Sequence, residues 1–134
     1  MVSPAGAPGA HGGVNSTLRD LGRYGMLYTP SWNKVSRQQV VPDALIKRIQ
    51  RDGRPEIYNN GKGQAVWDGY MGEECAHATR QWDFVTTDGD FGKAGYHGQT
   101  LYISPTKNLV VASFATGEKY DTFRFARAIR QSLK

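Results

Sequence analysis

The sequence predicts an α+β fold in which an antiparallel sheet of about three to four strands carries a C-terminal helix and follows two N-terminal helices. Three observations lead to this prediction. Apolar residues recur at helical spacing twice before residue 53, two strand-like segments joined by a turn occupy residues 99–114, and helical spacing returns after residue 121. The order helix, helix, strands, helix is typical of an antiparallel sheet with helices kept apart from it in sequence.

The length of 134 residues and the hydrophobic fraction of 39% suit one domain with a modest core. Residues 1–13 are rich in Gly, Pro and Ala and cannot bury enough apolar surface to offset the entropy of ordering. We therefore expect a flexible lead-in over residues 1–13 and a single segment over residues 14–134.

The first helix is expected to have about three turns and to end near Tyr28, before Pro30. Ser16 or Thr17 can cap its N-terminus. Asp20 stands three residues after Thr17, which is the spacing of a capping box.

A second helix is expected over Val40–Asp52. Pro42 fits the first helical turn, and Asp43 favours the positive end of the helix dipole. Gly53 closes the helix. Its apolar face is formed by Leu45, Ile46 and Ile49.

The middle of the chain gives weaker signals. Residues 54–63 are rich in Gly, Asn and Lys and are interpreted as a loop. Ala65–Tyr70 and Gln81–Thr87 are each predicted as a strand that carries a Trp, and residues 88–90 are predicted as a turn.

A hairpin gives the clearest strand signal. Gln99–Ser104 alternates polar and apolar residues, and Leu109–Phe114 is β-branched and almost continuously apolar. Pro105–Asn108 supplies the residues of a turn. Because apolar or small residues fill every position of Leu109–Phe114, we expect it to be a central strand that is buried on both faces.

The C-terminal segment predicts a helix that lies on the sheet. Asp121 can cap it. Four apolar residues follow at helical spacing: Phe123, Ala126, Ile129 and Leu133.

The net charge of +5 comes from basic residues that are scattered along the chain, with a mild concentration in the C-terminal helix. No motif that reads DNA or RNA accompanies this charge, which argues against nucleic acid as a partner. No segment approaches the roughly 20 apolar residues of a membrane helix, so no membrane partner is expected. Residues 1–13 lack the pattern of a signal peptide, so the sequence leaves the compartment open and favours the cytoplasm only if the chain is complete.

One cluster has the residue types of a metal site. With only one cysteine in the chain, no internal disulfide can form. A zinc site needs three or four ligands at recognisable spacing, and a polar loop around a partly buried cysteine explains the cluster better. We therefore expect neither a metal nor another cofactor. The cluster consists of Glu73, Glu74, Cys75 and His77.

Three aromatic residues could line a substrate pocket, but aromatic side chains on strands belong more often to the core. A core position is therefore the favoured interpretation for all three. They are Trp67, Trp82 and Tyr102.

Three segments together resemble the C-terminal part of the serine β-lactamase and penicillin-binding-protein superfamily, in its class C-like branch. They are HGGVNSTLRDLGRYGMLY at residues 11–28, VVPDALIKRI at residues 40–49 and GYHGQTLYISPTKNLVVASF at residues 95–114. The resemblance covers residues 11–134 and depends on the order and spacing of the segments rather than on any one motif. It implies a partial β-lactamase-like fold.

The resemblance also implies a serine hydrolase for amides or esters, in which a Ser attacks a carbonyl while a Lys and a Tyr handle its proton. In that family a Lys-Thr-Gly or His-Thr-Gly strand binds the substrate. Tyr96, His97 and Gly98 occupy the place of this triplet, and the backbone N–H of Gln99 resembles the oxyanion-hole donor. Tyr96 replaces the usual cation, whereas shifting the match by one residue puts His97 there and leaves Gly98 one place early. His97 can equally be a strand histidine satisfied by hydrogen bonds.

The family's nucleophile lies in a Ser-x-x-Lys motif upstream of the Gly-Gly helix, and its Tyr motif also precedes that helix. These 134 residues contain two Ser-x-x-Lys matches, at Ser31–Lys34 and Ser104–Lys107. With seven Ser and seven Lys in the chain, both are interpreted as chance matches. Ser31 falls in an expected inter-helix loop, and Pro105 prevents the helix that would align Ser104 with its lysine.

Three functional hypotheses follow. The first is the C-terminal part of a β-lactamase-related serine hydrolase that is inactive alone and acts on a small amide or ester only when an N-terminal half completes it. The second is a binding module or non-catalytic subunit that completes an active site with a partner chain or by forming a homo-oligomer, because the family's terminal strands normally pair with N-terminal strands. The third is a basic nucleic-acid-binding domain.

Overall fold

The computed structural model describes residues 14–71, 75–117 and 121–134. The helices are α1 (Leu18–Met26), η1 (Pro30–Lys34), α2 (Asp43–Arg51), α3 (Pro55–Tyr58), α4 (Lys62–Met71), η2 (Tyr96–Gly98) and α5 (Asp121–Ser132). The strands are β1 (Cys75–Thr79), β2 (Trp82–Thr86), β3 (Phe91–Ala94), β4 (Thr100–Ser104) and β5 (Leu109–Ser113). The predicted lead-in over residues 1–13 lies outside the described residues.

The five strands form one antiparallel sheet in sequence order, β1-β2-β3-β4-β5. The α+β class is confirmed, with one or two strands more than expected. β4 and β5 pair from Thr100↔Ser113 to Ser104↔Leu109 without a register shift. The β1–β2 pair, in contrast, has register shifts on both sides of His77.

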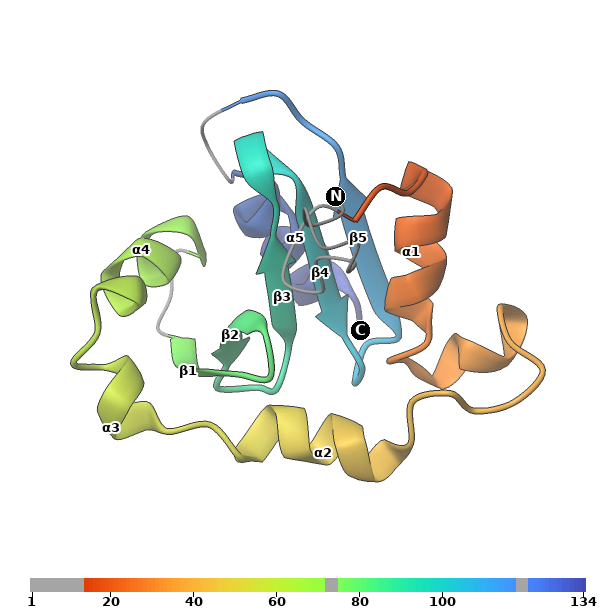
Figure 1. Cartoon of the computed structure of the whole chain (residues 1–134), viewed down its shortest axis with the longest axis horizontal. Helices are drawn as coiled ribbons and strands as arrows, with labels where there is room; N and C mark the ends of the chain where they lie inside the picture. Colours follow the sequence, from red (N-terminus) through yellow and green to blue (C-terminus); the bar gives the residue numbers. More distant parts are fainter. Residues whose placement is uncertain (1–13, 72–74, 118–120) are drawn as a thin grey trace, which may run out of the picture.

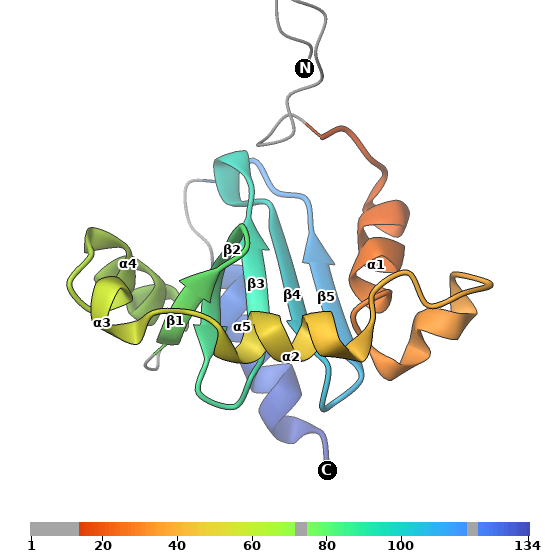
Figure 2. The ribbon, with the colours of Figure 1, turned by 60° about the horizontal axis from the view of Figure 1, so that its bottom comes forward.

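Helices cover both faces of the sheet. α1 and α2 lie on one face and α5 lies behind the other (Figures 1 and 2). Because successive strand residues point to opposite faces, Leu101 and Ile103 join the core under α1 and α2, while Tyr102 joins the core under α5. α4 contributes Met71 to the second core.

The start of α1 is capped as the sequence predicts. The Oγ1 of Thr17 accepts a hydrogen bond from the backbone N–H of Asp20 at 3.1 Å. Further along, α1 lies so close to β5 that a Cβ added to Gly25 would stand 2.6 Å from Cγ1 of Val110. A glycine at residue 25 therefore sets the distance between this helix and the sheet.

Two expectations in the middle of the chain are wrong. The expected loop at residues 54–63 contains α3, and the expected strand Ala65–Tyr70 lies inside the helix α4. Packing explains the second difference, because in the helix the Trp67 ring reaches Phe84 at 5.9 Å and Phe123 at 6.0 Å between ring centroids. Tertiary contacts of this kind override weak local patterns.

The position of β5 also differs from the prediction. β5 is an edge strand of the described sheet, where a central strand was expected. Its apolar residues on both faces have a different cause: Val110 and Ala112 pack on the core under α1, and Leu109 and Val111 pack on the core under α5. All five residues stay half-buried.

A buried cluster of charges joins α5 to the turn between β2 and β3. Asp90 is fully buried, and its Oδ2 accepts hydrogen bonds from Nη1 of Arg127 and Nε of Arg130, each at 3.1 Å, and from the hydroxyl of Tyr102. Asp88 binds the same two arginines at 3.1 and 2.7 Å. Burial, together with the charge of Asp90, raises the pKa of Tyr102.

Candidate functional site

The residues predicted to bind substrate lie together in the connection between β3 and β4. Tyr96–Gly98 is a short 3₁₀ turn, and Gln99 precedes the first residue of β4. The turn is closed by a hydrogen bond of 2.7 Å from the N–H of Gly95 to the carbonyl oxygen of Gln99. The predicted triplet is therefore placed in a turn at the end of a strand and not on the strand itself.

The backbone of this turn is left-handed at two successive residues. His97 has φ 56° and ψ 42°, and Gly98 has φ 83°. Glycine reaches such angles without steric cost, and His is among the few other residues that visit them. The left-handed pair makes the sharp bend that brings the chain from β3 into β4.

Aromatic side chains are exposed at this end of the sheet. Tyr96 is 80% exposed, and its ring contacts the His97 ring edge-on at 3.9 Å between centroids. Phe114 follows Ser113, which pairs with Thr100, so it lies at the same end and is 45% exposed. Exposed aromatic rings next to free backbone can contact a substrate.

The backbone N–H of Gln99 donates no hydrogen bond to any residue of the described ranges, and neither does that of Tyr96. A donor of this kind can bind the negative oxygen of a tetrahedral intermediate. The structure thus offers two candidate oxyanion donors, one at each end of the turn, where the sequence indicated only Gln99.

Sequence reasoning missed Lys93, which lies on β3 immediately before the turn. Its Nζ is 2.6 Å from Oδ1 of Asp83 on β2, and Oδ2 of the same carboxylate accepts the N–H of Ala94 at 2.7 Å. Lys93, Ala94 and Gly95 have the order cation, small residue, glycine. This order of residue types is the sequence signal from which Lys93 could have been predicted. The three residues lie nearer to the strand than Tyr96–Gly98 does.

Neither Ser-x-x-Lys match has the geometry of an activated nucleophile. Ser31 lies in the 3₁₀ helix η1 instead of a loop, and its Oγ accepts a hydrogen bond from Nδ2 of Asn108 at 2.8 Å. Ser104 is completely buried, and its partner Lys107 donates to the carbonyl of Leu133 at 2.8 Å. No described contact joins either serine to its lysine, as nucleophilic catalysis requires.

The cluster that was weighed as a metal site, and interpreted as a polar loop, is only partly described, since Glu73 and Glu74 lie outside the described residues. Cys75 is buried, and Nε2 of His77 is 3.0 Å from the carbonyl oxygen of Gln50. Within the described ranges no three Asp, Glu, His or Cys side chains gather as metal ligands would.

The three aromatic residues that were weighed as pocket residues belong to the core. Trp82 is 7% exposed and Tyr102 is 1% exposed. Trp67 packs against the core under α5. The core interpretation of all three is therefore confirmed.

The described residues define the class of the protein as an antiparallel α+β domain, which is consistent with part of a β-lactamase-like fold. A family model described as Beta-lactamase matches residues 1–133, and the chain belongs to that family. The protein is accordingly a β-lactamase-related domain, of a hydrolase kind. No solved structure matches the chain. Every helix in the described ranges is too short or too polar to cross a membrane.

Proposed function

We propose that this chain supplies the substrate-binding strand and turn of a serine hydrolase that cleaves an amide or ester through an acyl-enzyme. The observation that carries the proposal is the turn from Gly95 to Gln99, which leaves backbone donors unpaired beside exposed aromatic rings. Such donors stabilise the charge that develops on the carbonyl oxygen. The nucleophile and its lysine come from residues outside this chain, and the chain alone is inactive.

Two assignments of the substrate-binding triplet are compatible with this role. In one, Tyr96–Gly98 is the triplet and Gln99 gives the oxyanion donor. In the other, Lys93–Gly95 is the triplet and the donor is the N–H of Tyr96. The salt bridge from Lys93 to Asp83 partly neutralises the cation, which favours neutral substrates over those with a carboxylate.

A hydrolysis assay tests the proposal. The chain alone is expected to turn over neither nitrocefin nor a p-nitrophenyl ester, and turnover is expected when a Ser-x-x-Lys segment of the family is supplied. In the completed enzyme, replacing the true donor residue by Pro removes its N–H and lowers kcat by about 10²–10³-fold. Comparing Gln99→Pro with Tyr96→Pro therefore distinguishes the two assignments of the triplet. Turnover by the chain alone that Ser31→Ala abolishes would show the proposal to be wrong.

A second candidate function is a non-catalytic module that completes an active site with a partner or by oligomerising. The observation that favours it is the open outer edge of β5 in the described sheet. A chain of this kind is expected to associate or to bind a hydrophobic dye. Light scattering that shows a stable monomer without dye binding would count against it.

A further inference from the structure

Asp83 on β2 lies beside the strand end from which the candidate turn starts. The pairing of β2 with β3 ends at Phe84↔Gly92, and β3 continues for two more residues, Lys93 and Ala94. On its other side, β3 stays paired with β4 as far as Ala94. The β2–β3 ladder of the described sheet therefore stops before the last two residues of β3.

The two carboxylate oxygens of Asp83 have different partners at this place. Oδ2 accepts the backbone N–H of Ala94 at 2.7 Å, as a carbonyl of a neighbouring strand would. Oδ1 is 2.6 Å from Nζ of Lys93. The next residue, Gly95, donates the hydrogen bond to Gln99 that closes the turn. One side chain therefore fixes the end of the strand and holds the cation that stands just before the turn.

The ion pair leaves the Lys93 ammonium with little attraction for another anion. The Asp83 side chain is 21% exposed, so water screens this pair less than it screens a pair on the open surface. Burial raises the pKa of the Tyr58 hydroxyl on α3, and nearby charges, Asp68 and Asp83 among them, raise it further. A carboxylate that approached Lys93 would therefore meet negative charge already in place.

We propose that Asp83 is the residue that sets the substrate class of this site. Its Oδ2 holds the end of β3 and so positions the turn with its donors, while its Oδ1 occupies the ammonium of Lys93. The site takes an amide or ester that is neutral around the scissile bond. A substrate with a carboxylate at this place binds poorly as long as Asp83 carries its charge. This inference rests on the proposed function for the idea that the turn binds substrate.

The test is a titration of the ¹⁵N-labelled chain, followed by NMR, with N-acetylglycine and with its neutral analogue N-acetylglycinamide. Asp83→Asn keeps the size of the side chain and an oxygen acceptor for Ala94 but removes the charge. Asp52→Asn is the matched control, because it changes the net charge equally and Asp52 also binds cationic side chains, at the surface. A double variant with Asp83→Asn and Lys93→Met removes the ammonium as well.

N-acetylglycinamide is expected to shift amide signals of residues 93–99 in the wild-type chain, and N-acetylglycine is expected to bind no more tightly. Asp83→Asn should strengthen N-acetylglycine binding about fivefold, the factor for two like charges about 4 Å apart in water, and leave N-acetylglycinamide binding unchanged. The control leaves both affinities unchanged, and the double variant loses the gain. Tighter binding of the acid by the wild type, an equal gain in Asp52→Asn, a gain that persists without Lys93, or no shift with either probe would overturn the proposal.

Amide exchange of Ala94 tests the positioning role separately. Its N–H is expected to exchange about fivefold faster in Asp83→Ala, which removes the acceptor, and at nearly the wild-type rate in Asp83→Asn, which keeps one. Equal exchange in all three proteins would show that Asp83 does not hold the strand end. None of these readouts involves hydrolysis. The substrate class can therefore be wrong while the acyl-enzyme role stands, and a failed hydrolysis assay leaves the binding result intact.

Discussion

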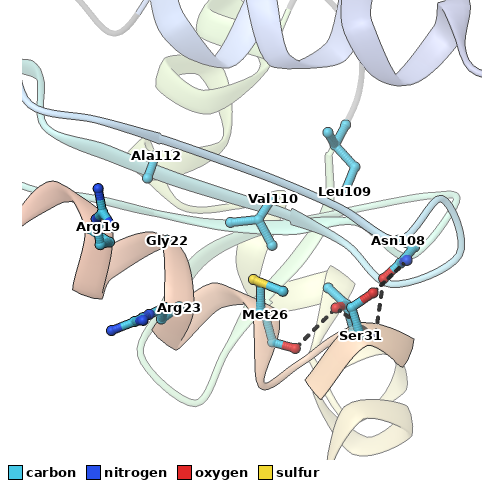
Figure 3. Close-up of a pocket in the computed structure, with 10 residues that line it drawn as sticks. Arg19, Gly22, Arg23, Met26, Ser31, Asn108, Leu109, Val110 and Ala112 are labelled. Atoms are coloured by element: carbon cyan, nitrogen blue, oxygen red, sulfur yellow. Dashed lines mark hydrogen bonds between the residues drawn. The ribbon is translucent and has the colours of Figure 1, made fainter. Parts of the chain in front are cut away.

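The two edges of the sheet differ in how they meet their surroundings. β1 pairs with β2 through register shifts on both sides of His77, and both α3 and α4 contact it. β5 pairs with β4 without a register shift, and α1 packs against β5 and lines a groove beside it (Figure 3). Both strands are short and lie at an end of the described sheet, so neither length nor position accounts for the difference.

This difference concerns how each edge of the sheet is protected against pairing with another strand. Bulges twist an edge away from straight pairing, and a covering helix hides its backbone groups. β1 has register shifts and two contacting helices, whereas β5 has no register shift and is contacted by α1 and α5. The two edges therefore differ in the regularity of their pairing.

The largest expected effect comes from the buried charges that hold α5 behind β4 and β5. Asp90→Ala removes the buried carboxylate that Arg127 and Arg130 share, and removing one partner of a buried ion pair costs about 3–5 kcal/mol of unfolding free energy. Urea unfolding measures the loss.

Asp52→Ala is the matched control for this prediction, because Asp52 also binds two arginines but at the surface. A much smaller loss is expected there. Equal losses in the two variants would show that the buried cluster does not anchor α5.

The next effect concerns the close contact of α1 with β5. Gly25→Ala puts a methyl group 2.6 Å from Cγ1 of Val110 and should cost about 1–3 kcal/mol by overpacking. Gly22→Ala on the same helix meets nothing within 4 Å and should stabilise the chain by about 0.5–1 kcal/mol through helix propensity. Thermal unfolding of both variants is the measurement. Opposite signs are expected, and equal stabilisation would mean that α1 does not lie this close to β5.

Stability should also depend on pH in the acid range. Burial alone would raise the pKa of Asp88, but hydrogen bonds from Thr86 and Arg127 hold it below its usual value. A carboxyl with a lowered pKa in the folded state stabilises the fold above its unfolded pKa of about 3.9, and this contribution is lost as pH falls through the folded pKa. Urea midpoints are therefore expected to fall below about pH 4, and to fall less in Asp88→Asn. An identical fall of the urea midpoint in Asp88→Asn would show that Asp88 does not cause the pH dependence.

The smallest effect on stability comes from adding a charge to the open edge. Ser113→Lys, at the end of β5, is expected to change the unfolding free energy by less than about 0.5 kcal/mol but to weaken any pairing of another strand with this edge. Thr79→Lys on β1 should leave association unchanged. Light scattering compares the association of the two variants. The same response in both would show that the two edges do not differ in their tendency to pair.

The strongly patterned elements of the fold could be predicted from the sequence. α1, α2, β2, β4, β5 and α5 lie where apolar spacing and capping residues place them. β1 and β3 were missed because CAHAT and FGKA contain small residues or Gly and little strand propensity. α4 was taken for a strand because its two glycines weaken the helical signal, and the contacts of Trp67 that decide its structure are not local.

The candidate site was predictable in part. The sequence indicated the region of Tyr96–Gln99. Its turn, however, depends on the left-handed backbone of His97, which the residue type alone does not predict. Lys93 was overlooked because the salt bridge to Asp83 and the strand that carries it appear only in three dimensions. The assignment of Tyr96, His97, Gly98 and Gln99 to substrate binding stays a prediction.

Amide hydrogen exchange of residues 109–113 tests most directly the central claim that β5 is an edge strand of this sheet. In a regular antiparallel edge strand, alternate N–H groups point away from the sheet, and these should exchange fast in the free chain. Uniformly protected β5 amides in the free chain would contradict the account.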